Sequence, residues 1–222
     1  MLFQLSRIII LSTLFLASPV KAENTWQLTK QEEGIQVYVR DNPSSPIKIF
    51  RGVVTLPATK LSSLVAVLDD VKAMPQLLHN CKSAKILKKE SDFSTTLYVV
   101  SKMPWPVKNR DSIVYSVMTQ DKNTKKVLIK MQSKPKSVPP KKGMVRVQAM
   151  SGYWEFMPVL VDGKNSKNVK VTYELSIDPG GSLPKWLVNT LAVDFPFYTL
   201  KNLRELVKKP VYRDAKSPNI IN

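Results

Sequence analysis

The chain has 222 residues, of which 34 are Lys or Arg and 17 are Asp or Glu, so its formal net charge is +17. With 43% hydrophobic and 23% charged residues it has the composition of an ordinary globular protein, which excludes the collagen-like and disordered classes. A single Cys and a single His exclude an intrachain disulfide and most structural zinc sites, which need four nitrogen or sulfur ligands.

The first 22 residues are predicted to be a secretory signal peptide. Arg7 supplies a positive charge, and residues 8–17 (IIILSTLFLA) form an apolar run that is too short to span a bilayer. Val20 and Ala22 follow at the positions that precede a cleavage site. Cleavage would remove two basic residues and no acid, so the single domain left, residues 23–222, would carry a net charge of +15. We therefore expect an exported protein, periplasmic if the cell has two membranes; an uncleaved N-terminal anchor is the alternative.

The mature part begins with two predicted strands and a helix. Residues 35–40 and 47–56 alternate in polarity and are rich in β-branched side chains, which favours two strands joined by a turn. Pro57 opens the next stretch, in which apolar residues recur at helical spacing as far as Val71. We expect a helix there and a second, short helical stretch at 74–78.

The central part of the chain has the pattern of a long antiparallel sheet. The segments predicted as strands are 83–89, 93–103, 112–119, 126–133, 144–156 and 168–177. Clusters of Pro, Gly, Asn or Asp separate most of them, which indicates short connections between antiparallel neighbours. A final helix is expected over 183–207, kinked or interrupted at Pro196. Together these elements predict an α+β architecture.

Three segments resemble one known family. Residues 103–115 (MPWPVKNRDSIVY) resemble the proline–aromatic–proline and Arg-Asp signature of START domains, the lipid-transfer domains related to steroidogenic acute regulatory protein. Residues 178–189 are similar to the segment that leads into their C-terminal lid helix, and residues 81–87 resemble the start of their third strand. The likeness spans about residues 26–209 in family order. It implies a helix-grip fold, in which a curved antiparallel sheet surrounds a long C-terminal helix and a lipid-sized tunnel lies between them.

Such a tunnel requires inward side chains at alternate strand positions and an apolar helix face that closes it. The residues predicted to contact a lipid are Tyr98, Val100, Ile113, Tyr115 and Tyr153 on the strands, with Leu187, Leu191, Phe195 and Tyr198 on the lid helix. From the residues alone, the alternative is that these side chains fill a solid core.

Some members of the family keep a charged pair inside the tunnel. Aligned on Arg110 and Asp111, those two positions fall at Leu97 and Ser116, so the resemblance implies that this pair is absent here. A phospholipid or another acyl lipid is therefore expected ahead of a sterol or other polycyclic ligand. We interpret Arg110 and Asp111 themselves as a structural ion pair or turn.

A basic segment is the second candidate for function. Residues 122–146 contain nine basic residues and no acid, and residues 133–143 form a Pro- and Lys-rich loop that the resemblance places at the tunnel mouth. The residues predicted to dock transiently on an anionic membrane are Lys134, Lys136, Val138, Lys141 and Lys142. Each lysine would contribute about 1 kcal/mol near such a surface, and the valine would enter the interface. The alternative is a solvated loop that keeps the protein soluble.

Two tryptophans stand close to these segments. Trp105, between two prolines, is predicted to pack as a rigid plug of its loop. Trp186, at the start of the lid helix, is predicted to pack between helix and sheet, and an interfacial membrane anchor is the alternative.

The residues give little support to catalysis. His79 and Cys81 lie two positions apart, a spacing that allows a nucleophile pair but more often means a surface His beside a buried Cys. The chain contains no G-x-S-x-G motif and no Gly-rich phosphate loop. We expect no cofactor, no metal, no nucleic acid partner and a monomer. The predicted function is exported lipid binding and transfer; the alternatives are an exported helix-grip enzyme, hydrolase- or cyclase-like, and a basic polyanion-binding surface protein.

Overall fold

The computed structural model describes residues 25–43, 48–161 and 164–222, so the predicted signal peptide lies outside the described residues. Ten strands of the described chain form one sheet. Their bounds are β1 Gln27–Glu32, β2 Ile35–Arg40, β3 Ile49–Leu56, β4 Cys81–Ser91, β5 Ser94–Ser101, β6 Arg110–Gln120, β7 Val127–Ser133, β8 Val145–Arg146, β9 Ala149–Val161 and β10 Lys164–Asp178.

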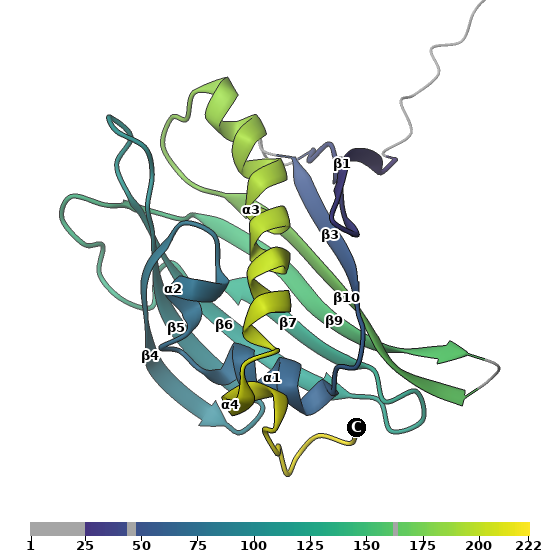
Figure 1. The fold of residues 1–222 in the computed structure, drawn as a ribbon. Helices are drawn as coiled ribbons and strands as arrows, with labels where there is room; N and C mark the ends of the chain where they lie inside the picture. The colour runs from purple at the N-terminus through teal and green to yellow at the C-terminus, as the bar shows by residue number, and fades with distance from the viewer. Residues whose placement is uncertain (1–24, 44–47, 162–163) are drawn as a thin grey trace, which may run out of the picture.

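The sheet runs in the order β1-β2-β3-β10-β9-β7-β6-β5-β4, and all of these neighbours are antiparallel. The two-residue β8 pairs in parallel with the start of β6. Most neighbours follow one another in the chain, as the short predicted connections require. β7 and β9 are separated in the chain only by the short β8. The long-range exception is the pair β3–β10, which brings the N-terminal strands beside the last strand (Figure 1).

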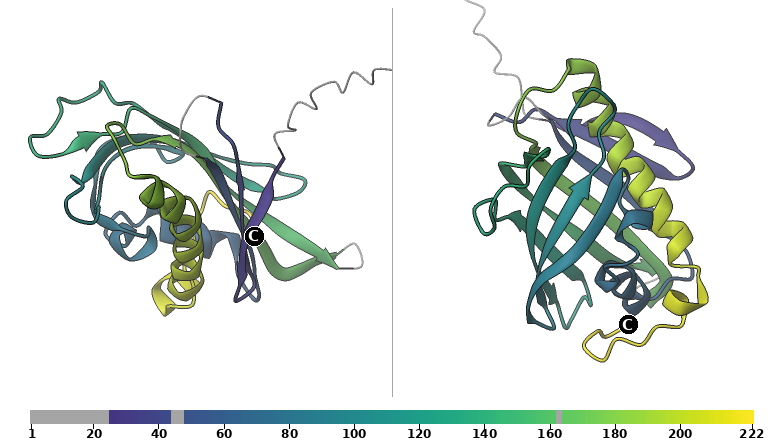
Figure 2. Two further views of the ribbon diagram at one scale, coloured as in Figure 1. Left: turned by 90° about the horizontal axis from the view of Figure 1, so that it is seen from above. Right: turned by 90° about the vertical axis from the view of Figure 1, so that its left-hand side faces the viewer.

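Four helices accompany the sheet, and their bounds are α1 Leu61–Asp69, α2 Met74–Leu77, α3 Lys185–Leu206 and α4 Pro210–Arg213. The sheet curves around α3, which lies on its concave side together with α1 and α2 (Figure 2). The long helix packs most closely on β2 and β3. This curved antiparallel sheet around a C-terminal helix is the predicted α+β helix-grip fold.

Most predicted elements are present within a few residues of their expected bounds. β1 (QLTKQE) was not predicted, because its side chains are almost all exposed and carry no apolar alternation. The predicted strand 144–156 is divided into β8 and β9. Of the two expected effects of Pro196, the interruption is wrong: α3 is continuous through this residue. Its buried neighbours Phe197 and Leu200 hold the helix on the sheet, so packing outweighs the lost backbone hydrogen bond.

Two glycines allow close approach of backbone and side chains. A Cβ on Gly52 of β3 would lie 2.6 Å from Leu200 Cδ1 and 3.2 Å from Pro196 Cβ, so this glycine lets α3 lie directly on the strand. A Cβ on Gly152 of β9 would lie 2.2 Å from the backbone oxygen of Glu174 on β10. Gly152 therefore marks a place where the sheet bends too sharply for any side chain.

We expect Gly152→Ala to lower the free energy of unfolding by about 1–3 kcal/mol, because the backbone of β10 must move to admit the new methyl group. Urea unfolding followed by circular dichroism measures the change. The matched control is Ser151→Ala at the neighbouring exposed position, where the added strain is absent. Equal stability of both variants would show that the bend tolerates a side chain.

Candidate functional site: the cavity under the long helix

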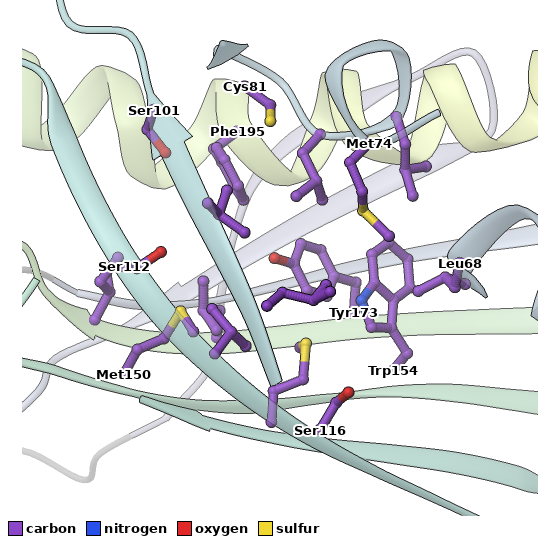
Figure 3. Close-up of a pocket in the computed structure, with 18 of the residues that line it drawn as sticks. Leu68, Met74, Cys81, Ser101, Ser112, Ser116, Met150, Trp154, Tyr173 and Phe195 are labelled. Carbon is purple, nitrogen blue, oxygen red and sulfur yellow. The ribbon is translucent and has the colours of Figure 1, made fainter. Parts of the chain in front are cut away.

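A cavity lies between the concave face of the sheet and the helices α1, α2 and α3 (Figure 3). Its volume is about 190 Å³. Voids in a close-packed core rarely exceed one water molecule, so this space is not a packing defect. A solid core, the alternative that the residues alone left open, is therefore not what the fold adopts, and most of the cavity lining is apolar.

The alternation of side chains along β5 and β6 builds one wall of the cavity. Leu97 and Val99 of β5 pair with Val114 and Ser112 of β6, and all four side chains line the space. Ser116, two residues further along β6, continues the same face. The two positions at which the resemblance implied a missing charged pair, Leu97 and Ser116, are thus both on the cavity wall, and both are uncharged.

An aromatic cluster forms the floor. The rings of Trp154 on β9 and Tyr173 on β10 stack with centroids 3.9 Å apart, and Phe50 and Phe195 pack against Tyr173 at 5.7 and 6.3 Å. Burial raises the pKa of Tyr173, so its hydroxyl stays protonated at physiological pH. That hydroxyl points into the cavity in Figure 3, where it can donate a hydrogen bond to a ligand.

The two ends of the cavity differ in charge. Where β6 begins, the buried Arg110 lines the cavity together with Met103 and Pro179. Where β6 approaches the turn between β4 and β5, the lining includes Asp69 and Asp92, both of which are exposed. A cationic end is therefore buried and an acidic end faces water.

The structure brings part of the predicted lid face to the cavity. Leu191 and Phe195 line it, whereas Leu187 is buried but lies outside the lining. Tyr198 is 37% exposed and stacks on His79 with ring centroids 4.8 Å apart. Only the middle part of the predicted helix face therefore lines the cavity, because Leu187 and Tyr198 make their contacts outside it.

The predicted strand face is wrong and needs correction. Tyr98, Val100 and Ile113 lie on the outer face of the sheet, where they form a second buried cluster with Val138 and Met144 packed against it. Successive side chains of a strand point to opposite faces, so a phase error of one residue moves the whole set to the other side.

The other two predicted strand residues are also on the outer face. The ammonium of Lys134 lies 3.5 Å from the ring centroid of Tyr115, and the hydroxyl of Tyr153 donates to Glu174 Oε2 at 3.0 Å. None of the five predicted strand residues lines the cavity. The signal that would have corrected the phase was available in Leu97 and Ser116, the two aligned tunnel positions.

Arg110 and Asp111 do not form the expected ion pair, because adjacent strand residues face opposite ways. Asp111 instead binds Arg146: its carboxylate accepts from Nε at 3.0 Å and from Nη2 at 2.9 Å, and both side chains are buried. The Tyr98 hydroxyl donates to the same carboxylate at 2.9 Å. Burial opposes ionisation of Asp111, but the hydrogen bonds from Arg146 and Tyr98 outweigh it and lower its pKa.

The Lys-rich loop lies on the outer face of the sheet, and the chain after it returns beside the start of β6. None of residues 134–144 lines the cavity, so the expected position at the mouth is not observed. Val138 packs against the outer cluster and does not project, whereas Lys136, Lys141 and Lys142 are exposed. The proposed membrane contact of these lysines stays a prediction.

Both tryptophans differ from their expected packing. Trp105 is 92% exposed at the tip of the loop between β5 and β6, so it does not plug that loop. Trp186 is 59% exposed in the first turn of α3, so it does not pack between helix and sheet.

The two candidate catalytic side chains do not act on each other. Cys81 is buried and lines the cavity, and burial raises the pKa of its thiol. His79 stacks on Tyr198 and makes no hydrogen bond to the thiol in the described chain; burial lowers its pKa. This arrangement lacks the activated thiolate that a Cys–His nucleophile needs.

Among the residues that the structure describes, no helix is both long and apolar enough to cross a membrane. No three His, Cys, Asp or Glu side chains within 25–43, 48–161 and 164–222 gather as a metal site.

Comparison with known proteins gives consistent matches. A family model described as START domain matches residues 11–210. An uncharacterized protein of Pseudomonas aeruginosa is 35% identical over 184 residues, covering 83% of this chain and 87% of its own. Phosphatidylcholine transfer protein of Mus musculus is 30% identical and covers 80% of this chain and 81% of its own. The crystal structure of a STAR-related lipid transfer protein from Xanthomonas axonopodis superposes with a TM-score of 0.74 at 34% identity, covering 83% and 99% of the two chains.

We expect Cys81 to react with a maleimide at pH 7.5 at least about tenfold more slowly in the folded protein than in urea, because the residue is only 7% exposed and burial raises the pKa of its thiol. The chain contains one Cys, so the rate of label incorporation reads this position alone. Because the pKa of the thiol is raised, the labelling rate of the folded protein should increase with pH at higher pH values than the rate of free cysteine does. A folded rate equal to that of the unfolded chain would contradict the burial of Cys81.

Proposed function

Because the chain belongs to the START domain family, we propose that it binds one acyl lipid in the cavity under α3 and exchanges that lipid at a membrane surface. The observation that supports this most directly is the apolar cavity enclosed between sheet and helices, which is far too large for a packing void. Relatives whose names describe lipid transfer support the same function.

The lining favours an acyl lipid. Leu97 and Ser116 leave the middle of the β5–β6 wall uncharged, and the aromatic floor offers a flat apolar surface with one hydroxyl donor. A relative named for phosphatidylcholine transfer adds weight to a phospholipid. A sterol is the second choice, because this cavity lacks the charged pair that some members of the family have in their tunnel.

Energetics explain why such a protein would carry a lipid without a chemical step. Burying about sixteen methylenes is worth roughly 13 kcal/mol relative to water. A bilayer offers nearly the same stabilisation, so transfer between membrane and cavity is close to balanced while the free lipid in water is avoided. Exchange then depends on how the protein meets the membrane.

We place the membrane contact at the end of the cavity marked by Arg110. There the β5–β6 loop and the segment before α3 lie side by side, because Arg110 donates to the carbonyls of Lys108 at 2.6 Å and Gly180 at 3.3 Å. Trp105 and Trp186 project from these two segments into solvent, and indole favours the membrane boundary. The two tryptophans would enter the interface while nearby exposed lysines attract anionic headgroups.

The Lys-rich loop returns to the sheet beside this same end, where the amide of Val145 donates to the carbonyl of Asn109 at 3.0 Å. Lys136, Lys141 and Lys142 are therefore available to the membrane that the tryptophans would contact, at about 1 kcal/mol each. The sequence of residues 1–22 supports export, which would place this exchange outside the cytoplasm.

The cavity proposal predicts that Ser116→Trp weakens lipid binding at least about tenfold, because the indole would occupy space on the cavity wall. Displacing only two methylenes would cost about 1.6 kcal/mol, which is more than tenfold in affinity. The matched control is Val117→Trp, which places the same side chain one residue further on the outer face. Uptake of a fluorescent phospholipid from vesicles measures both variants. Undiminished uptake by Ser116→Trp would place the lipid elsewhere, and no uptake by the wild type would contradict the function itself.

The docking proposal predicts that Trp105→Ser with Trp186→Ser slows lipid transfer between vesicles of phosphatidylglycerol and phosphatidylethanolamine. Burying about 60 Å² of apolar surface contributes about 1.5 kcal/mol, so a loss of roughly tenfold in rate is expected. Binding of detergent-solubilised lipid should not change. Val211→Ser is the control, since Val211 is 70% exposed on α4, beyond the far end of α3. A second variant replaces Lys136, Lys141 and Lys142 by Gln. If this variant transfers lipid slowly while the double Trp variant transfers it at the wild-type rate, docking depends on the loop alone.

A further inference from the structure

Arg110 is a buried cation that forms no ion pair with the acidic residues that the structure describes. Its side chain is 3% exposed, and none of its nitrogen atoms lies within 4 Å of a carboxylate oxygen among the described residues. Asp111, its neighbour in the chain, faces the other side of the sheet and is engaged by Arg146. A buried guanidinium normally has an ion pair, so this one is exceptional.

The hydrogen bonds of Arg110 leave much of the guanidinium unused. Nη1 donates to the carbonyl of Lys108 and Nη2 to that of Gly180. Nε is buried and has no hydrogen-bond partner in the described chain. A guanidinium has five N–H donors in a planar fork, and only two of them are used by acceptors among the described residues. Burial also lowers the pKa of Arg110, which reflects the cost of keeping an unpaired charge there.

Arg110 stands at an end of the cavity that also carries two serine side chains. Arg110 lines the cavity, and Ser112 lies two residues on, on the same face of β6. Ser101 is the direct cross-strand partner of Arg110 and also lines the cavity. No other buried side chain in the lining carries a full charge, since Asp69 and Asp92 are exposed at the far end.

We propose that Arg110 binds the anionic group, a phosphate or a carboxylate, of the lipid held in the cavity, with the hydroxyls of Ser101 and Ser112 as supporting donors. This inference rests on the proposed function and adds the chemical class and the orientation of the ligand. The anion lies at the end where β6 begins, between the loops that carry Lys108 and Gly180. The acyl chain runs from there along Leu97 and Val114 toward the aromatic floor.

The bound anion has a second consequence. Arg110 already joins the β5–β6 loop to the segment before α3, so an anion on its free donors stabilises the guanidinium that closes this end of the cavity. A neutral lipid of the same length fills the apolar wall but leaves that cation unpaired. The protein should therefore discriminate between lipids by charge, although the cavity wall itself is apolar.

The test compares lipids that differ only in the anionic group. Oleate is compared with oleyl alcohol, and oleoyl lysophosphatidic acid with monooleoylglycerol, by displacement of a fluorescent fatty acid from the full mature chain. A charge-assisted bidentate contact predicts that the wild type binds each anionic lipid about tenfold or more tightly than its neutral match. Arg110→Gln should remove that preference while binding of the two neutral lipids stays within about twofold.

Lys108→Gln is the matched control. It removes one positive charge from an exposed neighbour while keeping the backbone carbonyl to which Arg110 donates, so the preference should persist. Arg110→Lys keeps the charge and loses the fork, and it should retain part of the preference. Near-ultraviolet circular dichroism confirms that each variant is folded; if Arg110→Gln does not fold, Arg110→Lys and the wild-type comparison of charged and neutral lipids decide the question.

Each outcome has one meaning. Equal wild-type affinity for charged and neutral lipids would overturn the role of Arg110 and leave lipid carriage standing. Binding of inorganic phosphate as tight as that of lysophosphatidic acid, abolished by Arg110→Gln, would show a free-anion site instead of a headgroup site and overturn the proposal. Failure of every lipid to bind the wild type would contradict the proposed function, independently of Arg110.

Discussion

Neighbouring residues on a β-strand point to opposite faces of the sheet, and at the start of β6 this alternation separates the two polar networks that hold the molecule together. Arg110 faces inward and joins the β5–β6 loop to the segment before α3 through the carbonyls of Lys108 and Gly180. Asp111 faces outward and binds Arg146. Arg110 therefore connects the segments at one end of the cavity on the inner face. Asp111 holds the Lys-rich loop on the outer face through Arg146.

The outward network is buried, and burial sets its energetics. Arg146 donates to Asp111 and also to the carbonyls of Pro135, Val138 and Pro139, so the loop is anchored at three points along its length. Removing one partner of a buried ion pair typically costs about 3–5 kcal/mol, because the other charge is left uncompensated. The loop thus presents exposed lysines from a fixed base, while its one apolar residue stays packed on the sheet.

The cavity exists because α3 touches only part of the concave face. Gly52 lets the helix lie directly on β3, and Gly152 lets the sheet bend sharply at β9 and β10. The helix is therefore close to the sheet on one side, and the β5–β6 wall curves away from it on the other (Figure 2). Leu191 and Phe195 span the space between.

The sequence by itself determined the order and type of nearly all elements and, through the residues around Arg110, the family, because hydrophobic period and turn residues are local signals. It left open which side chains of β5 and β6 face inward. The set that includes Tyr98 and the set that includes Leu97 alternate equally well, and only the tertiary structure decided which set faces α3. The partner of Asp111 was equally beyond local pattern, since Arg146 lies 35 residues away along the chain and reaches it through β8. The lack of an acidic partner for Arg110 among the described residues follows from that choice, so it too became visible only in the folded chain.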